Sequence, residues 1–206
     1  MNYDILLAFT MATLVLSLSP GPDNIFVLIQ SITNGKKFGL AVVLGLMTGC
    51  LVHTSLLAFG VSAIIKNNPA IFTFIKIFGA AYLMYLAIMV YRGGDAISLD
   101  GGTRNKKSIS NLFRQGFIMN VLNPKVTIFF LAFFPGFLFS DSLSPIIQFY
   151  ILGFLFILVS TIVFGGMALL SGQISTFLVD NKRTGLVLKW VQIIVFIGIA
   201  IYLFIG

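Results

Sequence analysis

The chain alternates long apolar segments with short polar connections. Segments of roughly 18 or more apolar residues are long enough to cross a bilayer as helices. Six such segments are predicted, at about Ile5–Ile32, Gly39–Ile65, Ala70–Tyr91, Leu112–Phe139, Ser144–Ser171 and Gly185–Ile205. The one long polar connection, 92–111, divides a single transmembrane domain (1–206) into the halves 1–91 and 112–206. Because each half has an odd number of spans, the halves enter the membrane in opposite senses, which predicts an all-α fold of two inverted three-helix repeats.

The composition agrees with an integral membrane protein. The chain of 206 residues is 58% hydrophobic and 9% charged, whereas soluble domains carry roughly 25% charged residues. Its net charge of +7 would raise nucleic-acid binding in a soluble protein, but the basic residues lie in the connections and therefore indicate topology. Lys36, Lys37, the basic residues of 92–111, Lys182 and Arg183 belong to the first, third and fifth connections. This pattern places those connections in the cytoplasm and both termini outside it, with membrane lipid around the spans and no nucleic acid as a partner.

The first span of each half contains a break. The two breaks read Ser19-Pro20-Gly21-Pro22-Asp23-Asn24 and Asn123-Pro124-Lys125. Proline lacks a backbone N–H group, so the carbonyls of Leu16, Leu18 and Asn120 are expected to lose their helical partners. Broken backbone persists inside a membrane only where it faces protein or a water-filled cavity. Paired breaks of this kind point to a transporter binding site.

Each break is expected to begin a new half-helix near the middle of the membrane. Pro22 and Pro124 suit the first helical position, and Asn123 suits the N-cap. Two positive helix ends, freed carbonyls, a carboxylate and an ammonium group would then meet, and this combination suits a zwitterion. We therefore predict that a small amino acid binds at Pro20, Gly21, Pro22, Asp23, Asn24, Asn120, Asn123, Pro124 and Lys125. The alternatives are that the prolines only kink the helices, and that Asp23 and Lys125 form a structural pair.

Asp23 and His53 are the candidates for proton coupling. An acidic residue deep in a span, such as Asp23, is a functional candidate by default, as a ligand or as a proton carrier. His53 is the single histidine; it could relay protons because histidine titrates near neutrality, or it could only be hydrogen-bonded to a neighbouring helix. No metal site is predicted, because no cluster of metal-ligating side chains accompanies it. No cofactor motif or catalytic arrangement is present, so we expect neither a cofactor nor an enzymatic activity.

Small residues in the second span bear on assembly. Gly45 and Gly49 form a G-x-x-x-G pattern, which suits close helix packing. A chain of this size with six spans could form a homodimer, for which these glycines offer one face. Cys50 is the only cysteine, which excludes dithiol electron transfer within one chain.

The order and spacing of these motifs resemble a known family. They are similar to the lysine exporter superfamily, and closest to its homoserine/threonine exporter branch. The similar residues are Pro20-Gly21-Pro22; Gly35, Gly39, Gly45 and Gly49; Phe78-Gly79-Ala80-Ala81-Tyr82-Leu83; and Gly116, Asn120, Asn123-Pro124-Lys125, Phe129-Phe130 and Pro135-Gly136-Phe137. The resemblance implies a multi-pass protein of the cell inner membrane that exports amino acids such as threonine, homoserine or leucine by proton antiport. The alternatives are an exporter of a metal ion or of another small solute, and a purely structural membrane subunit.

Overall fold

The computed structural model describes residues 2–19, 21–61, 69–92, 108–174 and 182–205. Every regular element within these ranges is helical. The α-helices are α1 (Tyr3–Leu18), α2 (Pro22–Asn34), α3 (Lys36–Leu56), α5 (Pro69–Arg92), α6 (Ile109–Val121), α7 (Pro124–Ile128), α8 (Pro145–Leu169) and α10 (Lys182–Ile205). Two π-helical segments, η1 (Leu57–Val61) and η2 (Phe129–Phe133), and a 3₁₀ turn, η3 (Phe134–Phe137), complete the set.

The helices are apolar and long enough for a membrane protein. Within the described residues, Lys36–Gly60, Thr73–Arg92 and Pro145–Leu169 each have the length and composition to cross a bilayer. The pairs α1–α2 and α6 to η3 also pass this test if each bent pair is taken as one span, which gives up to five. The apolar part of α10, Lys189–Leu203, is shorter. The chain is therefore an α-helical membrane protein.

Local sequence signals explain where the helices begin. The side chain of Asn2 accepts hydrogen bonds from the first turn of α1, and Ser108 does the same for α6. Ser144 caps α8, whose first residue is Pro145. These caps satisfy backbone N–H groups that have no partner inside the helix.

The predicted breaks fall at the expected residues. The helix α1 ends at Leu18 and α2 begins at Pro22, with Ser19 and Gly21 in extended conformations. The second break separates α6 from α7, and the two helical axes there differ by 49°. Both breaks follow from proline, which disfavours a helical conformation in the residue before it and suits the first position of the next helix.

The second half-helix differs from the continuous helix predicted to reach Phe139. After five residues, α7 widens into the π-helical η2 and then tightens into η3, which ends at Phe137. Pro135 has no N–H group to donate to the carbonyl of Leu131, so a regular α-helix cannot continue through it. Irregular helical turns of this kind are frequent at functional hinges.

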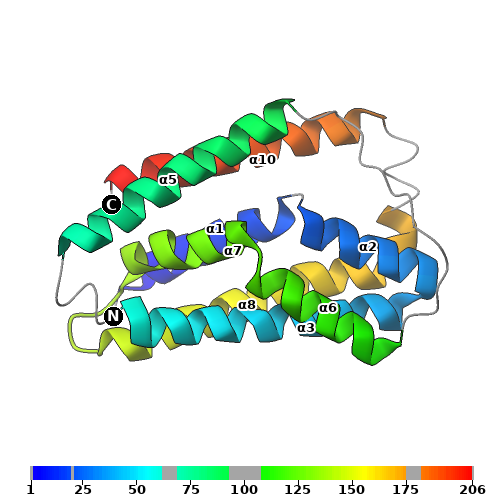
Figure 1. The fold of residues 1–206 in the computed structure, drawn as a ribbon, viewed down its shortest axis with the longest axis horizontal. Helices are drawn as coiled ribbons and strands as arrows, with labels where there is room; N and C mark the ends of the chain where they lie inside the picture. The colour runs from blue at the N-terminus through cyan, green and yellow to red at the C-terminus, as the bar shows by residue number, and fades with distance from the viewer. Residues whose placement is uncertain (1, 20, 62–68, 93–107, 175–181, 206) are drawn as a thin grey trace.

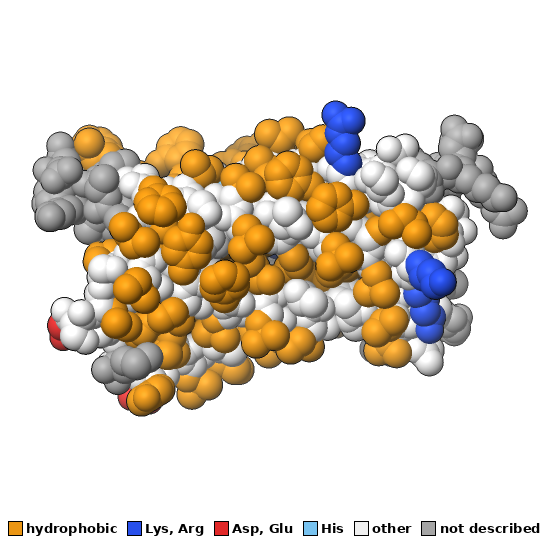
Figure 2. Space-filling model, turned by 90° about the horizontal axis from the view of Figure 1, so that it is seen from below, with side chains coloured by type: hydrophobic (Ala, Val, Ile, Leu, Met, Phe, Trp, Pro, Cys, Tyr) orange, Lys and Arg blue, Asp and Glu red, His pale blue; other side chains and the backbone are white. Residues whose placement is uncertain are grey.

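The helices pack in an arrangement that Figure 1 shows along the length of the molecule. There α5 and α10 lie side by side along one edge, while α3, α6 and α8 lie along the other, with α1 and α7 between them. Both chain ends lie at the same end of the molecule (Figure 1). Figure 2 shows apolar side chains across most of one face, with basic side chains toward one end and acidic side chains at the opposite end.

The glycines of α3 form an internal contact, which corrects the expectation that they offer a dimer face. A Cβ atom on Gly45 would overlap the backbone of α6 at Phe113, and one on Gly49 would lie 2.6 Å from Oδ1 of Asn120. From the other side, a Cβ atom on Gly116 of α6 would overlap the backbone of Val42. The prediction of close helix packing at these glycines is confirmed, but the helix that packs against them is α6 of the same chain.

Candidate functional site

The two breaks meet in space although they are 100 residues apart. The Nδ2 atom of Asn123 donates a hydrogen bond of 2.8 Å to Oδ2 of Asp23. The other end of the same amide, Oδ1, accepts from the backbone N–H of Lys125 at 3.0 Å. Asn123 therefore caps α7 and holds the carboxylate at the start of α2 with one side chain.

Asp23 keeps one carboxylate oxygen without a partner. Its side chain is buried, with 8% of the residue exposed. Oδ2 is bonded to Asn123, whereas Oδ1 has no hydrogen-bond partner. A buried carboxylate oxygen is a strong acceptor that is costly to leave unpaired. It is therefore available to a donor group from a ligand.

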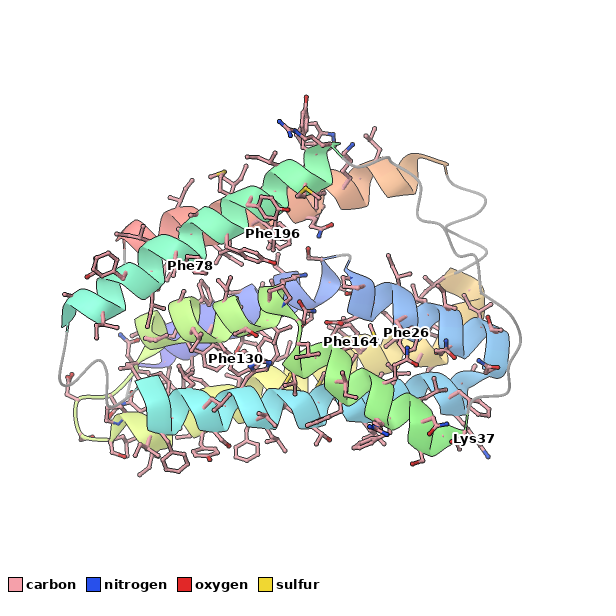
Figure 3. The ribbon with its side chains drawn as sticks, viewed as in Figure 1. Phe26, Lys37, Phe78, Phe130, Phe164 and Phe196 are labelled. Carbon is pink, nitrogen blue, oxygen red and sulfur yellow. The ribbon has the colours of Figure 1, made fainter. Side chains whose placement is uncertain are left out.

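Lys125 supplies the positive charge of the site. Its Nζ atom donates to the carbonyl of Ser19 at 3.5 Å and lies 5.2 Å from the centre of the Phe196 ring. Phe196 is on α10, in the region between α10 and the half-helices (Figure 3). A Cβ atom on Gly21 would lie 3.6 Å from this Nζ atom. The ammonium group thus borders the first break and interacts electrostatically with Asp23.

Asn24 connects the first break to α8. Its Nδ2 atom donates to the carbonyl of Ser17 at 2.8 Å and lies 3.6 Å from the sulfur atom of Met167. The hydroxyl groups of Ser17 and Ser160 are hydrogen-bonded to each other at 3.0 Å. All of these polar groups lie on the first break or face it from α8.

A second group of polar contacts surrounds the end of α6. The carbonyl of Asn120 accepts from Nε2 of His53 at 3.2 Å and from the backbone N–H of Asn123 at 3.0 Å. Because a carbonyl only accepts, the tautomer of His53 that makes this bond carries its proton on Nε2. The side-chain amide of Asn120 contacts the sulfur atom of Cys50. The interpretation of His53 as hydrogen-bonded to a neighbouring helix is confirmed.

The carbonyls released by the prolines differ in part from those expected. The carbonyl of Leu16 accepts from the N–H of Ser19 at 3.2 Å, because the last turn of α1 tightens. Side chains reach the carbonyls of Ser17 and Ser19 instead.

A cavity of about 30 Å³ lies between the breaks. Its polar lining comes from Ser17, Asp23, Asn24, Asn120, Asn123 and Lys125. Its apolar lining includes Leu16, Leu46, Met47, Val126, Phe156 and Phe164. One buried water needs roughly 10–15 Å³, so the cavity has room for about two waters, whereas ligand sites enclose about 300 Å³ or more. The site is closed in this structure, and an amino acid enters only if the surrounding helices separate.

The decisive observation on identity is a family model of LysE type translocators, which matches residues 14–206. The chain belongs to the LysE type translocator family. The resemblance noted in the sequence is thereby confirmed, and the family is one of transporters rather than enzymes.

The relatives of this LysE type translocator are of similar length. A "Homoserine/homoserine lactone efflux protein" of Salmonella typhimurium is 31% identical over 183 residues, which cover 89% of this chain and 88% of the relative. The protein of the same description from Salmonella typhi is 32% identical over the same shares. An "Uncharacterized membrane protein" of Vibrio cholerae is 29% identical over 86% of both chains. No solved structure matches the chain.

Most, but not all, of the predicted site residues of this LysE type translocator line the cavity between the breaks. Gly21, Pro22, Asp23, Asn24, Asn120, Asn123 and Lys125 line the cavity between the breaks. Pro20 lies outside the described residues. Pro124 is exposed and lines a different, apolar cavity of about 620 Å³ between α5 and α7. His53 reaches the site only through Asn120.

Several residues that line the cavity were not predicted. Cys50, Phe156 and Phe164 are among them. They stand among apolar residues in the sequence, so no local pattern marks them as part of a binding site. Ser17 was missed although a hydroxyl group four residues before Gly21 in an apolar span is a usable signal. Within the described residues, no three side chains of His, Cys, Asp or Glu come together in a group that could hold a metal ion.

Proposed function

We propose that this LysE type translocator exports small amino acids, of the threonine, homoserine or leucine kind, from the cytoplasm in exchange for protons. The single observation that carries the proposal is that Asp23, with one carboxylate oxygen that has no hydrogen-bond partner, and Lys125, with its ammonium group, line the same closed cavity. An amino acid bears the complementary pair of charges. The efflux description of the two Salmonella relatives supports the direction of transport.

Each charged group of a zwitterion has a partner in the cavity. The substrate ammonium group would donate to Oδ1 of Asp23, the oxygen that lacks a partner. The substrate carboxylate would accept from Lys125, which would exchange its long bond to the carbonyl of Ser19 for a stronger charged one. The N-terminus of α2 adds a positive potential. Its N-cap residue is Gly21, which has no side chain that could accept hydrogen bonds from the first turn of the helix.

We further propose that the chain spans the inner membrane six times, as two inverted repeats with both termini outside the cytoplasm. The first repeat would hold α1–α2, α3 and α5, and the second α6–α7, α8 and α10. The helix α5 packs against α10, and α3 packs against α8, so the second and third helices each contact their counterpart in the other half. Rocking one half against the other would open the cavity to each side in turn.

Asp23 would also carry the exchanged proton. When the substrate leaves, Oδ1 of Asp23 loses its donor, and a buried carboxylate oxygen without a partner is costly. A proton that binds Asp23 on the outer side neutralises the carboxylate and is released when the next substrate binds. His53 would assist as a second proton carrier beside the site, with its ring oriented by the hydrogen bond to the carbonyl of Asn120.

Release of a mixed amino-acid pool from proteoliposomes tests this function. The purified protein is reconstituted, and loss of each amino acid is followed with and without an imposed pH gradient. We expect gradient-dependent loss of one or a few small amino acids, abolished by Asp23→Asn and by Lys125→Met. Asp141→Asn is the matched control, because Asp141 is exposed and does not line the cavity.

The outcome separates the proposal from its rivals. If vesicles that contain folded protein lose no amino acid, the proposal fails, and a metal ion or another small solute becomes the candidate. If Asp23→Asn and Lys125→Met both transport at the wild-type rate, the breaks are structural kinks rather than a substrate site.

A further inference from the structure

One segment of the chain holds the buried polar atoms that lack partners. In the part of the chain that the structure describes, these atoms are Oγ1 of Thr13, Oγ of Ser19 and Oδ1 of Asp23. Thr13 and Ser19 are both 0% exposed. Asp23 and Ser19 belong to the first break, but Thr13 lies in the middle of α1, outside the site described above.

Thr13 departs from the usual behaviour of hydroxyl groups in this protein. In apolar helices, Ser and Thr donate to the carbonyl four residues earlier. Thr10 does so with Leu6 at 2.7 Å, and Thr48 does so with Leu44 at 2.8 Å. The hydroxyl of Thr13 makes no such bond. A buried hydroxyl group without a partner is costly.

Thr13 continues a polar stripe that starts at the cavity. Residues four apart lie on the same face of a helix, so Thr13 and Ser17 share the face of α1 that packs against α8. Ser17 lines the cavity and is bonded to Ser160 of α8. Hydroxyl groups therefore extend along the interface of α1 and α8, from the cavity toward the end of the molecule that holds both chain termini (Figure 1).

Aromatic rings pack around this stripe. Phe9, one turn before Thr13, is 0% exposed and contacts Phe134 with ring centres 4.9 Å apart. The Phe134 ring is in turn 6.0 Å from that of Phe156. The three rings come from α1, η3 and α8. Because η3 follows the irregular η2, a change in these turns would move Phe134 without unfolding α1 or α8.

We propose that substrate leaves the cavity along the interface of α1 and α8, past Ser17, Ser160 and Thr13, and that Phe9, Phe134 and Phe156 close this exit in the structure. The hydroxyl groups replace water around the charged ends of the substrate as it passes, which gives Thr13 the partner it lacks in the closed state. The proposal rests on the proposed function in that it takes the cavity to hold the substrate.

Cysteine accessibility tests the exit path. Thr13→Cys and Ser160→Cys are each compared with Met11→Cys, a control on the same helix whose side chain is 52% exposed on the outer surface of α1. A charged, membrane-impermeant thiol reagent is applied to spheroplasts and to inverted vesicles. The wild-type chain, in which Cys50 is the only cysteine, is the blank. Thiols react as thiolates in water, so a cysteine in hydrocarbon stays unmodified.

We expect Thr13→Cys and Ser160→Cys to react about tenfold or more faster than Met11→Cys in spheroplasts. Adding Phe134→Ala is expected to speed the reaction of Thr13→Cys further, with folding checked by size-exclusion chromatography. The proposal is overturned if both cysteines react as slowly as the control, or only in inverted vesicles. Since labelling needs no knowledge of the solute, failure of amino-acid transport would remove the proposed function while leaving this path in place.

Discussion

A series of glycine-to-alanine substitutions probes the contact that positions the second break. Gly45 and Gly49 bring α3 against α6, the helix that carries Asn120 near the site. Gly165 of α8 is the matched control, since nothing lies within 4 Å of the position that its Cβ atom would take. All three positions lie inside helices, so the helix propensity gained on substitution is similar.

The expected free energies differ because the obstructing atoms differ. Alanine in place of a helical glycine gains about 1 kcal/mol, and overpacking costs about 1–3 kcal/mol. At Gly45 the obstacle is the backbone of Phe113 and Phe117, which cannot move without displacing α6. Gly45→Ala is therefore expected to lose about 2 kcal/mol of unfolding free energy, from a cost of ~3 and a gain of ~1.

At Gly49 the nearest atom is Oδ1 of Asn120, which can rotate away, whereas Cβ of Asn120 at 2.8 Å is fixed to the backbone of α6 and overlaps less than the backbone does at Gly45. Gly49→Ala is expected to lose less stability than Gly45→Ala, but to reduce transport because it disturbs the contact of Asn120 with Cys50. Gly165→Ala is expected to be neutral or stabilised by up to about 1 kcal/mol.

Denaturant unfolding in detergent micelles gives the ranking, and efflux from proteoliposomes gives the activity. The reasoning is refuted if Gly45→Ala is as stable as Gly165→Ala, because α3 and α6 would then not be in close contact in the folded protein.

Three further predictions concern polar groups. Gln148→Leu should lower the melting temperature by several degrees in a thermal-shift assay, because the Gln148 amide bonds four backbone groups of the loop before α8. His53→Gln, which can still donate to the carbonyl of Asn120, should retain more efflux than His53→Leu; equal loss in both would argue against the hydrogen bond. Asn123→Asp places a carboxyl group against Asp23, so efflux should fall at neutral pH and recover partly at acidic pH, where a shared proton restores the bond; a flat pH profile would contradict this.

The breaks could be predicted because their cause is local. Proline removes an N–H group whatever surrounds it. The C-terminal end of α1 and the first residues of α2 and α7 therefore follow from the sequence within a residue or two. The presence of Asp23 and Lys125 beside these breaks then indicated a common site. The hydrogen bond that joins the breaks through Asn123 agrees with that expectation.

Other features could not be predicted because their cause is tertiary. The pattern at Gly45 and Gly49 gives the face that packs closely but not the helix that meets it. The bond between Ser17 and Ser160 joins residues 143 positions apart, which no local pattern encodes. The π-helical η2 lies next to Pro135 and contains stacked aromatic rings. Its conformation therefore depends on how these rings pack against neighbouring helices.

The central claim is that Asp23 binds the ammonium group of an amino acid, and equilibrium binding to purified protein tests it most directly. The affinities of the transported amino acid and of its deaminated analogue are measured for the wild type and for Asp23→Asn. The account predicts that the wild type binds the analogue about 10- to 100-fold more weakly than the amino acid, and that Asp23→Asn binds the two alike. If Asp23→Asn instead keeps the wild-type preference for the amino acid, Asp23 does not hold the ammonium group and the assignment of the site is wrong.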